Sequence, residues 1–156
     1  ERLASVRAAA AAQGVAPYMA IQNEYNLVVR AQFEGPVQTL CVEEGVASFP
    51  YFGLASGFLT GKYRTTADLD QGPRGYRVRD YFEKGQPILV AMDKVAAATG
   101  AKHAHIALAW INAQPGIAAP IASASRPEQV ADLVAGATLQ LAPEHIDIMN
   151  GANSLA

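Results

Sequence analysis

Apolar positions along the chain alternate between helical spacing and short unbroken runs, a pattern typical of helices that alternate with strands. Helical spacing with glycine stops or a proline start predicts helices over 1–14, about 34–45, about 87–99, 104–113, 126–135 and 143–149. Short apolar runs predict strands over 18–21, 46–52 and 117–122. Glycines indicate a loop over 53–63, and a stretch rich in Arg, Asp, Gly and Pro predicts a long surface loop over 62–87.

Strands that alternate with helices imply right-handed crossovers and a parallel sheet, so the expected fold class is α/β. Pro120 removes one ladder donor from the last predicted strand. A parallel sheet is normally covered on both faces, and three strands alone would expose ladder groups and apolar surface. Since Glu1 already lies in a helical pattern, we expect a segment of a larger domain.

Composition excludes several classes of protein. The chain has 156 residues, 51% apolar and 17% charged, which predicts a globular segment with a sizeable core. A net charge of −2 provides no broad basic surface, so no nucleic-acid partner is expected. Cys41 is the only cysteine, which excludes an intrachain disulfide and a zinc cluster and fits a cytoplasmic location. No apolar run approaches the roughly 20 residues of a membrane helix, so no membrane partner is expected.

The stretch 123–129 has the most informative local chemistry, because it follows an apolar run and opens a predicted helix. Ser125 and Glu128 have the order of a capping box, which predicts that Ser125 caps the helix. Free amides, the helix dipole, Arg126 and two serine hydroxyls would suit a phosphate group there. The alternative is an ordinary capped helix with a solvated arginine.

Four separated blocks, in order, resemble the aldo-keto reductases, most closely a bacterial branch with a long loop after the seventh strand. The blocks are Gln22-Asn23-Glu24-Tyr25-Asn26-Leu27 with Arg30, PYFGLASGFLTGKY over 50–63, Ala107-Leu108-Ala109-Trp110, and residues 121–129. The resemblance implies that 1–156 is the C-terminal segment of a single eight-stranded (β/α)8 TIM barrel, about strands six to eight with their helices.

The resemblance also implies the activity. Members of the family reduce aldehydes and ketones by hydride transfer from NADPH, so the implied partners are a small carbonyl substrate and the missing N-terminal half of the barrel. An Asp, a Tyr, a Lys and a His in that half assist proton transfer, and none of the four positions exists in this sequence. The chain by itself is therefore expected to be inactive, with no catalytic residue of its own, and it specifies no oligomeric state.

What the resemblance transfers to this chain is a set of contacts to NADP(H). Gln22 matches the glutamine that binds the nicotinamide carboxamide, and Tyr51 matches the aromatic that lies against the nicotinamide ring. The pyrophosphate loop corresponds to Phe52, Gly53, Leu54, Ala55 and Ser56, with Lys62 and Arg74 as covering cations. The adenosine 2′-phosphate and adenine contacts correspond to Ser123, Ser125, Arg126, Gln129 and Asp132.

The chain departs from the family pattern at two of these places. Phe52-Gly53-Leu54 stands where the family often has Ser-Pro-Leu, which affects the stiffness of the loop, and Leu133 stands where an asparagine often contacts adenine. Two alternatives remain open. One is a non-catalytic nucleotide-binding or regulatory module that pairs with another chain through open strand edges, and the other is a longer enzyme of which this sequence is a piece.

Several other residues with reactive or aromatic side chains are expected to have structural roles. His103 and His105 are expected to be partly exposed polar residues at a helix start, and Trp110 and Cys41 are expected to pack in the core. Tyr25 has no lysine or histidine in a motif-like relation and is not expected to act as a general acid.

Overall fold

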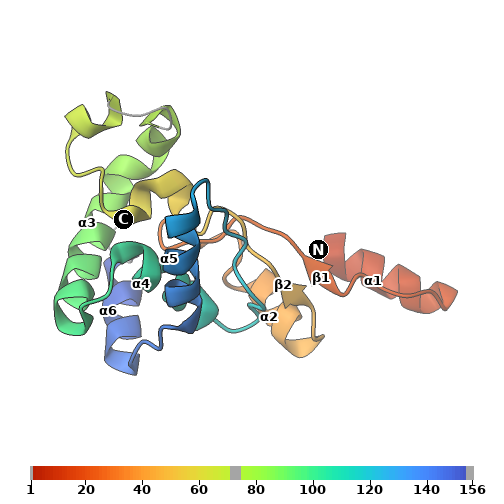
Figure 1. Cartoon of the computed structure of the whole chain (residues 1–156). Coiled ribbons are helices and arrows are strands. Elements are labelled where there is room, and N and C mark those ends of the chain that lie inside the picture. Colours follow the sequence, from red (N-terminus) through yellow and green to blue (C-terminus); the bar gives the residue numbers. More distant parts are fainter. Residues whose placement is uncertain (1, 71–74, 154–156) are drawn as a thin grey trace.

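The computed structural model describes residues 2–70 and 75–153 and has a small parallel sheet among several helices (Figure 1). In chain order the elements are α1 (Arg2–Gln13), β1 (Ala20–Ile21), α2 (Pro36–Glu43), β2 (Ala47–Ser48), η1 (Ala55–Thr60), η2 (Thr66–Asp70), α3 (Gly75–Thr99), α4 (His103–Asn112), α5 (Pro127–Thr138) and α6 (Pro143–Asn153). Here η denotes a 3₁₀ helix. The α/β class is confirmed, and most of the regular structure is helical.

The sheet is parallel, as predicted, but very short. β1 and β2 pair with Ala20 opposite Ala47 and Ile21 opposite Ser48. Further along, Glu24 and Tyr51 form an isolated parallel bridge.

The predicted third strand, 117–122, is wrong as a regular strand: in the described residues it forms one isolated bridge, Ser48 to Ile117. The Ser48 amide donates to the Gly116 carbonyl over 3.1 Å, and the Ala118 amide donates to the Ser48 carbonyl over 2.8 Å. The next two donors of the ladder would be Pro50 and Pro120, and neither proline has an N–H. The ladder therefore ends there, and the Ile121 amide takes the Pro50 carbonyl at 2.7 Å instead.

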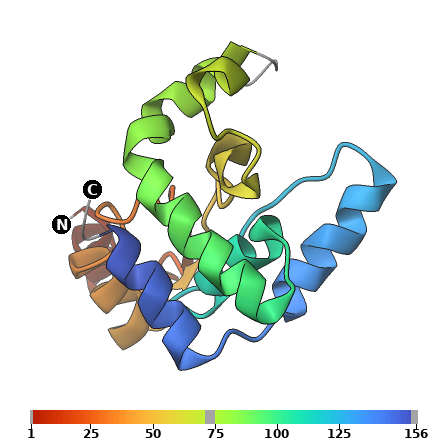
Figure 2. The ribbon, with the colours of Figure 1, turned by 90° about the vertical axis from the view of Figure 1, so that its left-hand side faces the viewer.

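Four helices pack into one cluster that contains most of the core. α3 and α6 run side by side, with α4 against them and α5 against α4 (Figure 2). Residues 106–111 of α4 are all buried, which confirms that helix as an interior element. Trp110 and Cys41 are both buried, as predicted, with exposed fractions of 0% and 2%.

α3 differs most from its predicted extent, because it begins at Gly75 rather than near residue 87. The prediction was wrong because it assigned the stretch rich in Arg, Asp, Gly and Pro over 62–87, which includes Gly85, to a surface loop. A Cβ atom at Gly85 would lie 2.1 Å from Cε1 of the buried Phe58, so the glycine serves close packing between α3 and η1. Much of the predicted loop over 62–87 is therefore helical.

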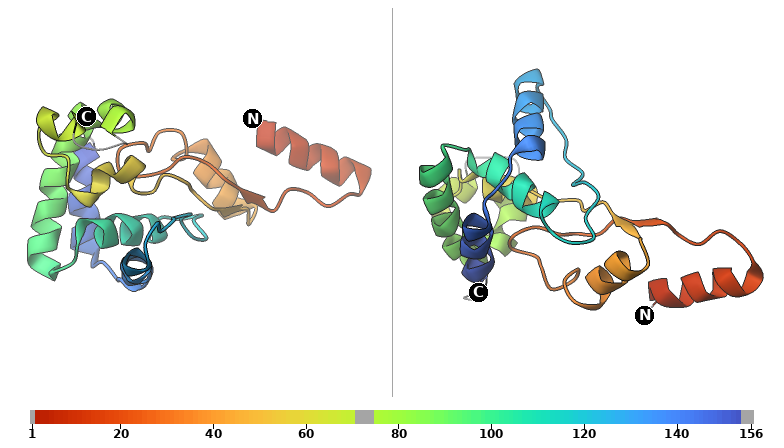
Figure 3. Two further views of the ribbon diagram at one scale, coloured as in Figure 1. Left: turned by 45° about the horizontal axis from the view of Figure 1, so that its top comes forward. Right: turned by 90° about the horizontal axis from the view of Figure 1, so that it is seen from below.

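α1 stands apart from the helical cluster and is joined to it by an extended segment (Figure 3). Its Arg7 side chain donates to Glu44 Oε2 over 2.6 Å and to the Tyr18 carbonyl. No helix in the described part of the chain combines the length and apolar character needed to cross a membrane.

Candidate functional site

The carboxyl ends of the two paired strands bring a polar amide and an exposed aromatic ring to the same edge of the sheet. Gln22 directly follows β1 and is exposed, and Tyr51, beyond β2, is 39% exposed. The two segments are joined because the Tyr51 amide donates to the Asn23 carbonyl over 2.9 Å. The structure thus brings together the two strand ends that the sequence analysis assigned to one site.

The segment after Tyr51 is a loop with left-handed backbone at residues other than glycine. Phe52, Ala55 and Ser56 have φ values of 56°, 47° and 57°. Each such residue costs on the order of 1–3 kcal/mol and persists only where surrounding contacts hold it. The Asn26 side-chain amide donates to the Phe52 carbonyl over 3.1 Å and so holds the start of this loop. Such strain is typical of a binding loop.

Gly53 lies in the same loop and packs closely against the side chain of Ile111. Its φ is not in the left-handed region, but a Cβ there would lie 2.9 Å from Cδ1 of the buried Ile111. The glycine therefore lets the loop approach α4 closely.

A cluster of charges fixes the chain directly after η1. Arg64 contacts both carboxylate oxygens of Asp93, at 2.8 and 2.7 Å, and its Nε donates to the Gly61 carbonyl over 2.8 Å. His103 Nε2 lies 2.9 Å from Asp93 Oδ1. The Arg64 hydrogen bonds hold the pKa of Asp93 below its usual range. Lys62 is exposed between these anchors, and Arg74 lies outside the described residues.

The start of α5 differs from the predicted capping box. The N-cap is Arg126, and in the part of the chain that the structure describes no side chain caps this helix. The Ser125 amide and Oγ both donate to Gln129 Oε1, over 2.8 and 3.1 Å, so Ser125 contacts Gln129 rather than Glu128. Pro127 explains the shift, because proline favours the first helical position and an extended residue before it. The Gln129 amide in the first turn donates to the Arg126 carbonyl over 3.1 Å.

Side chains at the start of α5 are accessible from solvent. Ser123, Ser125 and Arg126 are exposed. Asp132, one turn further, accepts from Lys102 Nζ over 2.7 Å and lies 3.0 Å from His105 Nε2. The Lys102 hydrogen bond, followed by that of His105, lowers the pKa of Asp132. His103 and His105 are partly buried at the start of α4, as predicted.

Sequence reasoning missed Tyr81 of α3. Its hydroxyl donates to Glu24 Oε1 over 2.9 Å, two residues beyond Gln22. Burial, followed by the hydrogen bond to Glu24, raises the pKa of Tyr81 to about 12, and the Ser56 hydroxyl opposes this rise. No local motif signals a contact between residues 57 positions apart.

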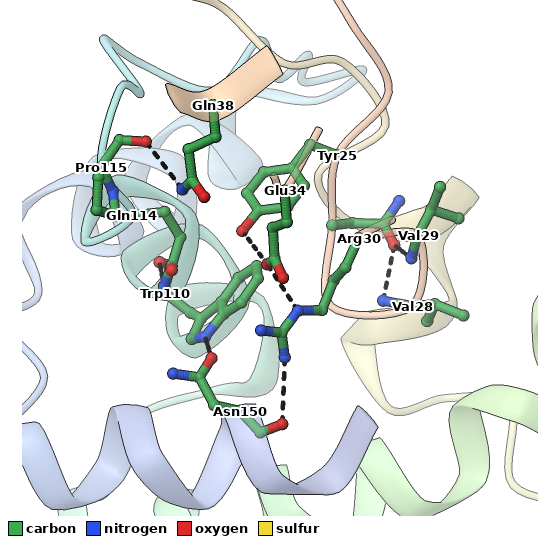
Figure 4. Close-up of polar contacts among 11 residues, drawn as sticks. Tyr25, Val28, Val29, Arg30, Glu34, Gln38, Trp110, Gln114, Pro115 and Asn150 are labelled. Carbon is green, nitrogen blue, oxygen red and sulfur yellow. Dashed lines mark hydrogen bonds and ion pairs between the residues drawn. The ribbon is translucent and has the colours of Figure 1, made fainter. Parts of the chain in front are cut away.

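A polar network lies behind the strand ends and connects them to α6 (Figure 4). Tyr25 is fully buried, and its hydroxyl donates to Glu34 Oε1 over 2.7 Å. Arg30 donates to the same oxygen over 2.7 Å and to the Asn150 carbonyl over 3.2 Å. The Trp110 indole N–H donates to Asn150 Oδ1 over 3.0 Å. Burial raises the pKa of Tyr25, so its phenol remains a donor.

A cavity of about 640 Å³ opens between this network and α3. Its lining includes Glu24, Arg30, Tyr81 and Lys84. Among the residues that the structure describes, no group of three or more His, Cys, Asp or Glu is arranged to hold a metal ion. The polar part of the cavity lining includes hydrogen-bonding side chains and charged side chains of both signs.

We expect the stability of the wild-type chain to fall more steeply above pH 10 than that of a Tyr81→Phe variant. The pKa of Tyr81 is raised to about 12 in the folded chain, against about 10 for an unfolded tyrosine. A raised pKa adds stability below about pH 10 that is lost as the pH rises toward about 12. Urea unfolding at about pH 9 and about pH 11, followed by circular dichroism, measures this difference. The expectation is contradicted if the free energy of unfolding falls by the same amount between these two pH values in both proteins.

Comparison with known proteins shows which family the sequence matches. The model of the aldo/keto reductase family matches residues 2–154. The chain is 30% identical over 129 residues to the aldo-keto reductase yakc [NADP(+)] of Schizosaccharomyces pombe, covering 78% of this chain and 37% of that protein. It is 28% identical over 131 residues to the aldo-keto reductase AMT2 of Alternaria alternata, covering 81% and 34%.

A chloroplastic pyridoxal reductase of Arabidopsis thaliana is 28% identical over 94 residues, covering 60% of this chain and 26% of that protein. The chain thus spans between about a quarter and two fifths of the length of these relatives. With the family model matched along almost the whole chain, and with the strand ends and strained loop arranged as described, the chain belongs to the aldo/keto reductase family.

Proposed function

We propose that this chain is the NADP(H)-binding portion of an aldo/keto reductase that reduces aldehydes or ketones to alcohols. The observation that carries the proposal is the juxtaposition, at adjacent parallel strand ends, of the exposed Gln22 amide, the exposed Tyr51 ring and a strained loop over 52–56. Support for the NADP form comes from the NADP(+) enzyme of S. pombe among the relatives and from the exposed Arg126 at the start of α5.

The residues present fit the chemistry of a nicotinamide dinucleotide. An amide side chain pairs with a carboxamide, and an exposed flat ring packs against a flat heterocycle while leaving its other face open. Backbone amides in left-handed conformations, such as those after Phe52, can turn toward a bound anion. NADPH, when bound, would supply the hydride that reduces the carbonyl carbon.

The roles within the chain then follow from charge and position. Gln22 and Tyr51 orient the nicotinamide ring, and the loop over 52–56 with Lys62 surrounds the pyrophosphate. Arg126, with Ser123 and Ser125, holds the 2′-phosphate at the helix start, where the dipole and a fixed cation act together. The Asp132 carboxylate faces Lys102 and His105, so its contact with adenine requires a rearrangement of that ion pair.

We further propose that the chain is one segment of a single barrel domain and that the groups for proton transfer lie in the other part. Its share of the relatives' length and its short, open-edged sheet support this division. Hydride transfer leaves an alkoxide that needs a proton, so the segment alone is expected to reduce no carbonyl compound. A cytoplasmic location fits a lone buried thiol, which persists in a reducing compartment.

Replacing Arg126 by alanine is the direct test of this proposal. A charge-assisted hydrogen bond to phosphate contributes about 1.5–3 kcal/mol, so NADPH is expected to bind about 10- to 100-fold more weakly, while NADH affinity is retained. Fluorescence titration of both dinucleotides measures the two dissociation constants. Lys94→Ala, which removes an exposed charge from α3, is the matched control and should leave both values unchanged.

Three outcomes would contradict the assignment. An unaltered chain that binds neither dinucleotide would overturn the cofactor-binding role of this segment. Equal weakening of NADPH and NADH would show that Arg126 does not read the 2′-phosphate. Unchanged NADPH affinity in Arg126→Ala would remove Arg126 from the site.

A further inference from the structure

We propose that Tyr81 is a positioning residue that holds the strained loop over 52–56 in its binding conformation by joining α3 to the end of β1; this inference rests on the proposed function. Its hydroxyl donates to Glu24 Oε1 over 2.9 Å. Glu24 in turn forms the parallel bridge with Tyr51, immediately before the loop. Tyr81 therefore contacts the framework from which the loop starts.

The far end of the loop lies near the same phenol. The Ser56 hydroxyl is close enough to lower the pKa of Tyr81, so one side chain of α3 faces residues on both sides of the loop. Ser56 is itself one of the residues with left-handed backbone, with φ at 57°. Since Asn26 already holds the Phe52 carbonyl, Tyr81 adds the restraint that the second half of the loop needs.

The charges around Tyr81 keep this contact intact near neutral pH. Burial raises the pKa of the phenol to about 12, with further contributions from Glu24 and Asp80, so the hydroxyl stays protonated and donates. Lys84 and Arg30 line the same cavity and balance the carboxylates there. The restraint therefore does not depend on pH in the range where the protein would work.

The test compares Tyr81→Phe with the wild type in the full chain by amide hydrogen exchange. The reporters are the amides of Ala55 and Gly57, which donate to the Phe52 carbonyl over 2.7 Å and to the Leu54 carbonyl over 2.9 Å. Loss of one hydrogen bond is expected to accelerate their exchange about fivefold and to weaken NADPH binding about fivefold. Exchange in α4 and α6 should stay unchanged.

Two further variants separate positioning from general stabilisation. Glu24→Gln keeps an acceptor for the Tyr81 hydroxyl and should retain exchange within about twofold of the wild type, whereas Glu24→Leu should behave like Tyr81→Phe. Tyr76→Phe removes the hydroxyl of an exposed tyrosine on the same helix and should change nothing.

The possible results distinguish this inference from the proposed function. If the wild-type chain binds no NADPH, the proposed function fails, and exchange at Ala55 and Gly57 still decides whether Tyr81 holds the loop. Unchanged exchange in Tyr81→Phe overturns the inference even if Arg126→Ala behaves as expected. Uniformly faster exchange across the helices would mean that Tyr81 only stabilises the fold, which also overturns it.

Discussion

Replacing Trp110 by alanine is expected to lower the free energy of unfolding by about 3–5 kcal/mol. The indole is fully buried in α4 and lies 5.3 Å from the Tyr25 ring. Its N–H donates to Asn150 Oδ1 on α6. Truncation would leave a cavity and an unpaired amide oxygen beside the Arg30 guanidinium, which now stacks 5.2 Å from the indole.

Urea unfolding followed by far-ultraviolet circular dichroism is the suitable measurement, because Trp110 is the only tryptophan and its fluorescence disappears in the variant. Trp110→Phe is the matched control. It keeps much of the ring volume and removes the N–H, so it should cost clearly less than alanine. A loss below about 1.5 kcal/mol for Trp110→Ala would show that the contacts among α4, α6 and the loop over 24–34 contribute little to stability.

Replacing Gly85 by alanine is expected to destabilise the protein by about 1–3 kcal/mol, although alanine is the better helix former. The added methyl group would lie 2.1 Å from Phe58 Cε1 and 2.6 Å from its Cζ. Phe58 is fully buried, so its ring cannot move without disturbing the contact between η1 and α3. The steric cost therefore exceeds the gain of about 1 kcal/mol in helix propensity.

Gly151→Ala provides the matched control for this second prediction. Gly151 also lies inside a helix, α6, but a Cβ there has open space around it. The control is expected to gain up to about 1 kcal/mol from helix propensity alone. Urea unfolding of both variants gives the comparison, and a stabilised Gly85→Ala would mean that α3 does not pack closely on η1.

The helices were largely predictable because each has its own spacing and stop signals. The segments 1–14 and 104–113 were placed within two residues of the observed bounds. The predicted start of α3 was too late because a stretch rich in Arg, Asp, Gly and Pro is typical of a loop, and only the position of Phe58 shows that Gly85 serves packing. The last strand was over-predicted because its composition is apolar, while the hydrogen-bond pattern depends on which proline faces which carbonyl.

The candidate site was partly predictable for the same reason. Gln22 follows the predicted strand over 18–21, Tyr51 lies near the end of the predicted strand over 46–52, and the family resemblance assigned both residues to one site. The contact of Tyr81 with Glu24 could not be inferred, because it requires the path of α3. The capping box failed because Pro127 moved the helix start by one residue, and the geometry of the NADP(H) contacts remains a prediction.

The close approach of Gly53 to Ile111 limits how this sequence can change over time. A residue with a Cβ at position 53 would bring that atom to within 2.9 Å of Ile111 Cδ1, the end of a buried side chain. The Ile111 side chain must then shift, and a smaller residue at 111 removes this requirement. The two positions are therefore coupled, so that a change at 53 is tolerated more readily after a change at 111 than before it.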